Sequence, residues 1–227
     1  MVDAKRIKKI AAGLGADLCG IAAADSFREA PGGFHPKDIY EDAKSVIVFA
    51  RRLPSSPLKA KTRVPYTFIT EMILNELYRI TYALTCRLED EGMTAIPIPS
   101  VPYDYWDAEN KVGKGILSLK HAGYLAGLGV FGKNTLLYNN RYGNMITLGA
   151  VLTDRELQSD PVANYKVCKD KCTLCIDKCP QKALDGAYVN QKLCREYAEI
   201  YNSRGFFIYA CSTCKSVCPS KNGVVNR

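Results

Sequence analysis

The sequence predicts an α+β protein in which an N-terminal domain of mixed α/β type precedes a small, helical, cysteine-rich domain. Two observations lead to this prediction. Segments with helical and with strand-like apolar patterns alternate along the first 160 residues. Eight of the ten cysteines lie between positions 168 and 218, after this pattern breaks near residues 158–164. We therefore place the domains at 1–160 and 161–227.

The first part of the chain is expected to alternate helix, strand, helix, strand over residues 3–15, 17–23, 38–43 and 45–50. The first helix carries its apolar residues on one face, and Gly15 ends it. The runs DLCGIAA and SVIVFA are short and apolar, as buried strands are. Cys19, in the first of these runs, is expected to be a small core residue.

The longest periodic segment covers residues 68–91, with Ile69, Ile73, Leu77, Ile80, Leu84 and Leu88 spaced by three and four and Gly92 as the stop signal. A strand over 94–98 follows. Residues 99–115 are rich in Pro, Asp and aromatic residues and are expected to form a loop. A helix over 117–126 then meets a glycine-rich turn, and two strands follow, over 134–138 and 145–152.

The composition is that of an ordinary globular protein, with 47% hydrophobic and 24% charged residues. The first residues, MVDAKRIKKI, have no apolar core of signal-peptide type, and no run approaches the length of a membrane span. We expect a cytoplasmic protein without a membrane partner. The cytosol keeps thiols reduced, so the cysteines favour metal binding over disulfides.

The eight clustered cysteines form two runs joined by one single cysteine. The order is Cys168-x3-Cys172-x2-Cys175-x3-Cys179-Pro180, then Cys194, then Cys211-x2-Cys214-x3-Cys218-Pro219. This is the pattern of a ferredoxin-like module with two 4Fe–4S clusters, in which the last cysteine of each run binds the other cluster. Two zinc sites with four thiolates each are the alternative, and the interleaved spacing with two Cys-Pro pairs favours iron and sulfide.

The spacing assigns one cluster to Cys168, Cys172, Cys175 and Cys218, and the other to Cys179, Cys194, Cys211 and Cys214. The irregular feature is the three-residue spacer after Cys168, where two residues are usual. Two oxidised clusters with their thiolates add about −4, which reduces the formal charge of +8 to about +4. The charge gives little support to nucleic-acid binding, although it does not exclude it.

Four segments resemble one known family in order along the chain. Residues 125–137, LAGLGVFGKNTLL, resemble the AGLGxxGKNTLL signature of epoxyqueuosine reductases, and residues 148–154, LGAVLTD, resemble the strand after it. Residues 15–22 and 43–48 are similar to that family's N-terminal strands, and the cysteine pattern agrees. The resemblance implies a cobalamin-binding mixed α/β domain followed by a ferredoxin module, an architecture shared with reductive dehalogenases. Cobalamin or another cobamide would lie between the two domains.

Within this resemblance, the glycine-rich turn is the predicted cofactor-binding segment, through Gly127, Gly129, Gly132, Lys133, Asn134, Thr135 and Tyr142. Glycines allow the backbone to approach a large flat ligand closely, and polar side chains can bond to its amides. The alternative is that the glycines serve a tight turn only. His121, just before the turn, is expected to be a hydrogen-bonded helix residue and not a cobalt ligand.

The predicted proton donors lie in the segment before this turn. The family has a catalytic aspartate fourteen residues before the first glycine of the signature, where this chain has Gly113. The candidates nearby are Asp104, Tyr105 and Asp107, since a buried Asp with a raised pKa, or a Tyr, can donate a proton. The alternative is that they are ordinary loop residues.

These features predict an oxidoreductase that passes electrons from two 4Fe–4S clusters to a bound cobamide for reduction of an unidentified substrate. The alternative is an electron-transfer protein that reduces the corrinoid of a partner. Both need a low-potential electron donor of ferredoxin or flavodoxin type, and the second adds a corrinoid protein as partner. A third hypothesis, tRNA binding through the basic N-terminal helix, rests on a charge pattern that is typical of solvated helix faces.

Overall fold

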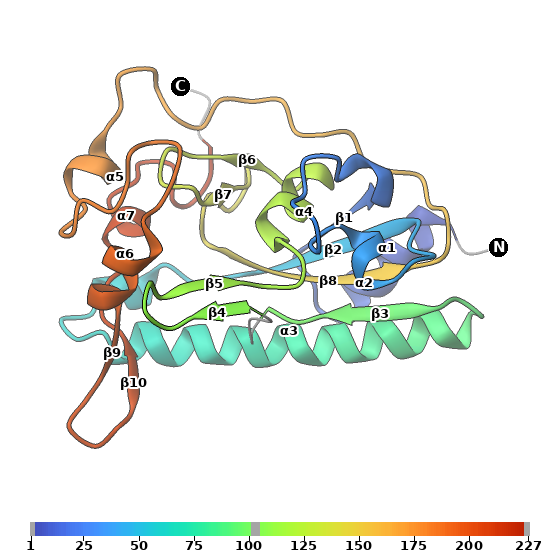
Figure 1. Cartoon of the computed structure of the whole chain (residues 1–227), viewed down its shortest axis with the longest axis horizontal. Helices are drawn as coiled ribbons and strands as arrows, with labels where there is room; N and C mark the ends of the chain where they lie inside the picture. The colour runs from blue at the N-terminus through green and yellow to red at the C-terminus, as the bar shows by residue number, and fades with distance from the viewer. Residues whose placement is uncertain (1–2, 101–104, 225–227) are drawn as a thin grey trace.

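The computed structural model describes residues 3–100 and 105–224, and its centre is a four-stranded antiparallel sheet (Figure 1). The strands are β1 (Leu18–Ala23), β2 (Ser45–Arg52), β8 (Ile146–Thr153) and β3 (Ala95–Ile98), in the spatial order β1-β2-β8-β3. All three strand pairs are antiparallel. The α+β class is therefore confirmed, and the sheet itself contains no parallel pair among these strands.

Apolar side chains cover both faces of the sheet, because successive residues of a strand point to opposite sides. In β2, Val46 and Val48 join the hydrophobic core on one face, and Ile47 and Phe49 join the core on the other. This burial on two sides explains why the strands are continuous apolar runs.

Helices pack on both faces of the sheet. The core on one face includes residues of α1 (Ala4–Gly13) and α3 (Val64–Asp90), and the core on the other includes residues of α4 (Leu119–Leu125). Helix α3 has 27 residues and buries Leu77, Ile80, Leu84 and Leu88 fully, which is the periodic stripe predicted from the sequence. Short 3-10 turns lie at Ala24–Ser26 and Ser56–Lys59.

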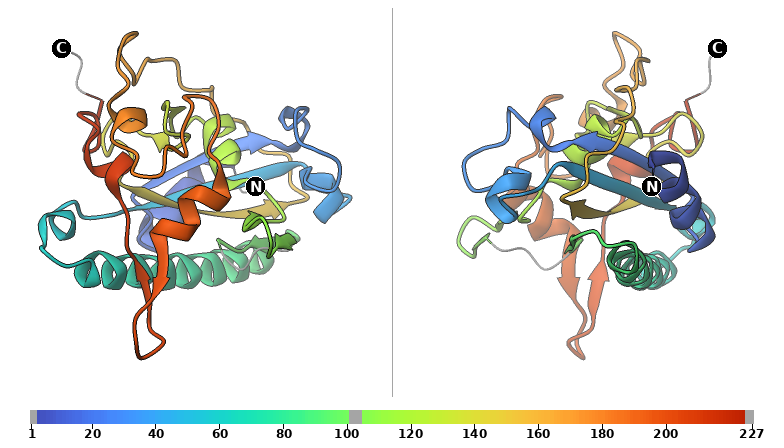
Figure 2. Two further views of the ribbon diagram at one scale, coloured as in Figure 1. Left: turned by 60° about the vertical axis from the view of Figure 1, so that its left-hand side comes forward. Right: turned by 90° about the vertical axis from the view of Figure 1, so that its right-hand side faces the viewer.

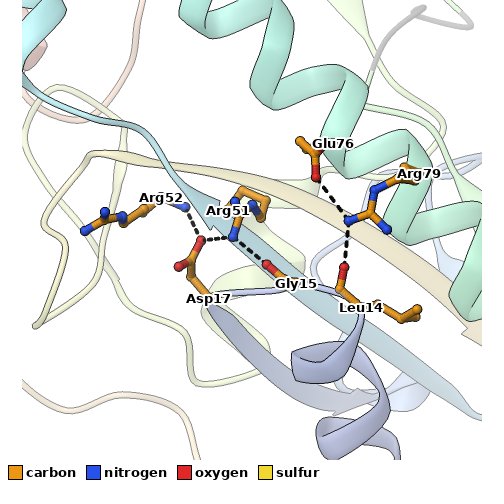
Figure 3. A network of polar contacts seen from close by, with 7 residues as sticks. All are labelled: Leu14, Gly15, Asp17, Arg51, Arg52, Glu76 and Arg79. Atoms are coloured by element: carbon orange, nitrogen blue, oxygen red, sulfur yellow. Dashed lines mark hydrogen bonds and ion pairs between the residues drawn. The ribbon is translucent and has the colours of Figure 1, made fainter.

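A polar network holds residues 14–17, which lead into β1, against β2 and α3 (Figure 3). The Asp17 carboxylate accepts a bond from the Arg51 guanidinium at 2.8 Å and one from the Arg52 N–H at 2.9 Å. Arg79 of α3 donates to the Leu14 carbonyl at 2.8 Å, just after α1 ends. These contacts hold α1, β2 and α3 together at one end of the sheet.

Three expectations about secondary structure were wrong or incomplete. The helix expected over 38–43 is instead α2 (Pro36–Ile39), which begins earlier because His35 caps it and proline occupies its first turn. The loop expected over 99–115 contains a hairpin of β4 (Tyr105–Asp107) and β5 (Val112–Lys114). The strand expected over 134–138 is reduced to β7 (Leu137–Tyr138), which pairs with β6 (Val130–Phe131).

The cysteine-rich tail folds at one end of the sheet, after a linker that runs back along the molecule (Figure 1). Its elements are α5 (Leu174–Asp177), α6 (Gln191–Ala198), β9 (Glu199–Tyr201), β10 (Phe207–Tyr209) and α7 (Thr213–Ser216). The β9–β10 hairpin extends past α3 (Figure 2), so the tail is not purely helical as expected. In the linker, Asp160 bonds to both backbone groups of Ile21 at 2.8 Å and so covers the open edge of β1.

Across residues 3–100 and 105–224, the longest apolar stretches within helices fall short of what a bilayer crossing requires.

Candidate functional site

The eight clustered cysteines are brought together by short helical turns of the tail. Cys175 lies in α5, Cys194 in α6 and Cys214 in α7, while the others lie in the connecting loops. Helices α5 and α7 pack against each other, which brings the two runs side by side. All eight thiols are free and partly buried.

Electrostatic interactions among the thiols group them into two sets. Burial raises the pKa of Cys175, and the nearby Cys168 and Cys218 raise it further. Burial likewise raises the pKa of Cys194, with Cys211 and Cys179 as its thiol neighbours. These neighbours are the ones that the interleaved assignment places in the same clusters.

The thiol of Cys214 also has a raised pKa, and its neighbours belong to the set that contains Cys194. The pKa of Cys214 is raised to about 11, first by burial and then by Cys194 and Cys211. Cys175, from the other set, has the smallest effect on it. The two sets are therefore adjacent, as two clusters that exchange electrons must be.

Within the part of the chain that the structure describes, no three His, Cys, Asp or Glu side chains converge as ligands of one metal ion. Four thiolates on one zinc would approach one another to roughly 3.8 Å, since the Zn–S bond is about 2.3 Å. A 4Fe–4S cluster needs no such convergence, because each thiolate binds a different iron.

Hydrogen-bond donors point at two of the sulfur atoms, as is common around iron–sulfur clusters. The Lys133 N–H lies 3.4 Å from Cys168 Sγ, and the Ala183 N–H lies 3.3 Å from Cys179 Sγ. The Cys211 thiol, by contrast, donates to the Thr213 hydroxyl oxygen at 3.4 Å. The donor set and its surroundings therefore fit two 4Fe–4S clusters.

The glycine-rich turn lies directly against the cysteine tail, and its polar side chains are engaged there. The Lys133 ammonium donates to the carbonyls of Asp170 at 2.9 Å and Cys172 at 3.0 Å. The buried Asn134 amide donates to the Cys214 carbonyl at 3.0 Å. These two residues join the turn to both cysteine runs.

The glycines of the turn are required by the packing of the chain itself. A Cβ added at Gly127 would lie 2.4 Å from the Pro161 carbonyl oxygen, and one at Gly129 would lie 2.2 Å from the Tyr138 carbonyl oxygen. At Gly132 the obstacle is the Tyr138 ring, at 2.5 Å. Close approach of backbone at Gly127 and Gly129, and of a side chain at Gly132, accounts for these glycines. Contact with a cobamide stays a prediction.

The remaining predicted residues of this region also have partners in the chain. Thr135 has a left-handed backbone with φ of 60°, and its carbonyl accepts a bond from the Lys120 ammonium at 2.9 Å. The Tyr142 ring lies under the Arg141 guanidinium at 5.0 Å. His121 shares a 2.7 Å hydrogen bond with the Ser118 hydroxyl, in agreement with its expected role as a hydrogen-bonded helix residue.

A buried polar network centred on Tyr138 was not predicted from the sequence. Its phenol oxygen lies 3.0 Å from the Asn134 amide nitrogen and 2.9 Å from the Asn144 amide nitrogen. The Asn144 amide also donates to the Lys215 carbonyl at 3.3 Å. The sequence offered no signal for this network beyond the density of Asn and Tyr between 134 and 144.

The β4–β5 hairpin, which carries two of the predicted proton donors, packs on helix α6 of the tail. The Gly113 N–H donates to the Gln191 side chain at 3.1 Å, and Arg195 donates to the Lys111 carbonyl at 3.1 Å. The Arg195 guanidinium also lies over the Trp106 ring at 4.9 Å. The hairpin therefore lies beside the helix that carries Cys194.

The predicted proton donors of this hairpin differ in their surroundings. Asp107 accepts two bonds from Asn110, which lower the pKa of its carboxyl and disfavour the protonated form. Tyr105 is 46% exposed, and the Lys114 ammonium lies 5.2 Å from its ring centre. Asp104 lies outside the described residues.

Two surface depressions lie away from the cysteines. One, of about 480 Å³, is lined by Lys5, Lys8 and Lys9 of α1 and by the linker near Asp160. The other, of about 340 Å³, lies between residues 42–44 and 154–155. Neither is lined by a cysteine or by the glycine-rich turn, so neither adds to the site.

Solved structures with the same fold include epoxyqueuosine reductases and reductive dehalogenases. The epoxyqueuosine reductase of Streptococcus thermophilus matches with a TM-score of 0.65 and 22% identity, over 98% of this chain and 67% of that one. A catabolic reductive dehalogenase, NpRdhA, in complex with 3-bromo-4-hydroxybenzoic acid matches with a TM-score of 0.73 and 17% identity, over 98% of this chain and 32% of that one. At these identities the matches establish the fold.

The sequence relatives are epoxyqueuosine reductases, as are the structures of the first group. The epoxyqueuosine reductase of Leadbetterella byssophila is 28% identical over 95% of this chain and 78% of its own length. That of Lactococcus garvieae is 35% identical over 44% of this chain and 30% of its own length. No family model matches the chain. The predicted resemblance is thus confirmed: over nearly its full length, the chain is similar to epoxyqueuosine reductases.

The chain is shorter than several of these proteins. The matched part covers 30% of the Lactococcus garvieae enzyme, and the chain spans about two thirds of the solved epoxyqueuosine reductases. The activity of the longer proteins therefore bears on this chain only as a proposal.

Proposed function

We propose that the tail binds two 4Fe–4S clusters and that the protein uses them as a low-potential path for electrons. The observation that carries this proposal is the packing of α5 against α7, which brings the two cysteine runs side by side. Two adjacent sets of thiolates, each drawing on both cysteine runs, match what a two-cluster module requires.

Metal analysis after anaerobic reconstitution tests this part of the proposal. We expect about eight iron and eight sulfide per chain, from two clusters of four. Cys218→Ser should lose up to half of the iron, whereas Cys86→Ser, on helix α3 and outside the runs, should lose none. Two zinc ions and no sulfide would contradict the proposal.

We further propose that these electrons pass to a cobamide and serve the reduction of a substrate that the chain does not identify. The support is the family resemblance, together with a dehalogenase of the same fold whose reaction is described as B12-dependent. A bound cobamide would supply a strong nucleophile and reductant, and the protein would orient it and exclude water. The electron source would be a low-potential donor of ferredoxin or flavodoxin type.

The alternative is that the clusters reduce a corrinoid held by a partner protein. Two observations favour it. Gly113 stands where the resembled family has its catalytic aspartate, and the side chains of Lys133 and Asn134 are already engaged with the cysteine tail.

Spectroscopy with added cobalamin separates the two. If the chain holds its own cobamide, reconstituted protein should shift the absorption spectrum of cobalamin to that of a base-off form. An unchanged spectrum, with full iron content and reduction of a partner's corrinoid, would refute the first candidate and support the second.

A further inference from the structure

The turn between β6 and β7 carries Lys133 to the first cysteine run. This turn is closed by its own backbone: the Thr135 N–H donates to the Gly132 carbonyl at 2.9 Å, and the Gly132 N–H donates to the Leu136 carbonyl at 3.0 Å. The Lys133 N–H donates out of the turn to Cys168 Sγ at 3.4 Å. A short, closed turn therefore holds Lys133 beside the first cysteine of the run.

The loop from Cys168 to Cys172 binds the ammonium of the same lysine. The Cys172 N–H donates to the Lys169 carbonyl at 3.0 Å, so the loop is itself a tight turn. The Lys133 ammonium donates to the Asp170 carbonyl at 2.9 Å and to the Cys172 carbonyl at 3.0 Å. This loop is the three-residue spacer that is longer than the usual two residues. Lys133 thus contacts it through the backbone N–H at one end and through the ammonium at the other.

The other lysines of this loop are in a different environment. Lys169 and Lys171 are exposed, whereas Lys133 is half-buried. Lys166 lies 3.5 Å from the Asp170 carboxylate, and both side chains of that pair are 86% exposed. Water and salt screen an exposed charge much more than a half-buried one. Among these lysines, Lys133 therefore has the strongest electrostatic effect on a cluster bound by the loop.

From this geometry we infer that Lys133 raises the reduction potential of the cluster bound by Cys168, Cys172 and Cys175, through a half-buried positive charge that the loop holds in place. The inference rests on the proposed function, because it requires a cluster at these cysteines. Lys133 is a positioning residue and not an iron ligand. One electron from the donor enters the cluster, no bond forms or breaks, and the ammonium keeps its proton.

The direction of the effect follows from charge. A 4Fe–4S cluster with its four thiolates carries about −2 when oxidised and about −3 when reduced. A nearby positive charge stabilises the more negative form more, and its effect decreases with distance. Removal of the Lys133 charge should therefore lower the midpoint potential of one cluster and change the other much less. We expect the ratio of reduced to oxidised cluster at a fixed solution potential to fall about tenfold, which corresponds to about 59 mV for one electron.

Three substitutions at position 133 separate the charge from the hydrogen bonds. Lys133→Met removes both, Lys133→Gln keeps an amide donor without the charge, and Lys133→Arg keeps the charge. The Met and Gln variants should lower the same midpoint by similar amounts, and the Arg variant should retain it. The Gln and Arg variants decide the question if Lys133→Met fails to take up iron.

Redox titration of the reconstituted full chain, followed by electron paramagnetic resonance, measures these midpoints. Lys171→Met is the matched control, because it removes the same charge from an exposed position in the same loop. We expect the control to retain both midpoints. The iron and sulfide content of each variant must first equal that of the unmodified protein.

Each outcome has a definite meaning. Unchanged midpoints in Lys133→Gln with full iron content would overturn the inference while the cluster proposal stands, and so would equal shifts of both midpoints. A shift of the same size in Lys171→Met would also overturn it, because any charge on the loop would then suffice. If the unmodified protein forms no clusters, the proposed function fails first, and the inference fails with it.

Discussion

Replacing Gly129 by alanine is expected to destabilise the protein even when no cofactor is bound. The glycine lies between α4 and β6, and its Cα faces the Tyr138 carbonyl of β7. An added Cβ would lie 2.2 Å from that oxygen and 2.7 Å from its carbon, whereas real Cβ atoms essentially never approach closer than 3.0 Å. The two backbone segments would have to separate by at least 3.0 − 2.2 = 0.8 Å.

The loss of stability from this clash is partly offset by a small gain from the unfolded state. Forcing an extra methyl group into a packed interior costs about 1–3 kcal/mol. Alanine restricts the unfolded chain more than glycine does and returns about 0.4–1 kcal/mol. The net loss should be about 1–2 kcal/mol, because a backbone oxygen cannot move aside as a side chain can. For a chain of this size that corresponds to a decrease in Tm of about 2–8 °C.

Thermal unfolding of the metal-free and cobamide-free protein, followed by circular dichroism, measures the effect. Gly13→Ala is the control, since nothing lies within 4 Å of a Cβ at that position, at the end of α1. It should be neutral or stabilising by up to about 1 kcal/mol. An unchanged Tm for Gly129→Ala, together with a loss of cobalamin binding, would refute the packing argument and show that the glycine serves a ligand.

Three further changes have measurable outcomes. Lys133→Met removes the charged donor to two carbonyls of the first cysteine run and should lower the free energy of unfolding by about 1.5–3 kcal/mol. The loss should appear as a lower midpoint of urea unfolding. An unchanged midpoint would show that these hydrogen bonds add nothing to stability. Arg195→Gln should release the hairpin from α6 and shift the emission of Trp106, the single tryptophan, to longer wavelength; Lys192→Gln, on the same helix, is the control and should not. The raised pKa of Cys19, about 12 because of burial, means that the folded state keeps this thiol protonated while the unfolded thiol ionises near 9. The stability that this raised pKa gives to the folded state is therefore complete below pH 9. It is lost as the pH rises towards 12, by up to about 1.4 kcal/mol per pH unit. Cys19→Ala should remove that part of the pH dependence of the free energy of unfolding.

The elements that were predicted well from the sequence are those that bury many of their own apolar residues. Strand β2 and helix α3 each contain enough buried apolar residues for the spacing of these residues along the sequence to indicate the type of element. Both elements occur close to the predicted ranges. The α2 helix was misplaced although its signals, His35 as cap and Pro36 in the first turn, were present in the sequence.

The elements that were missed depend on distant partners. Strands β4 and β5 have three residues each and are held by Gln191 and Arg195 of the tail, about 80 positions away, so no local pattern indicates them. The Tyr138 network likewise joins residues near 140 to carbonyls near 215. Cysteine spacing was informative because the geometry of a cluster constrains it locally.

The position of β8 within the sheet has a consequence for the synthesis of the chain. Both β2 and β3 pair with β8, yet β8 is translated last, about 90 residues after β2. Until residue 153 emerges from the ribosome, each of these earlier strands presents an unsatisfied edge that can recruit another chain. A truncated protein that ends before residue 146 should therefore accumulate as insoluble aggregate, whereas one that ends just after Asp160, with both the last strand and the cover over β1 in place, should be recovered in soluble form.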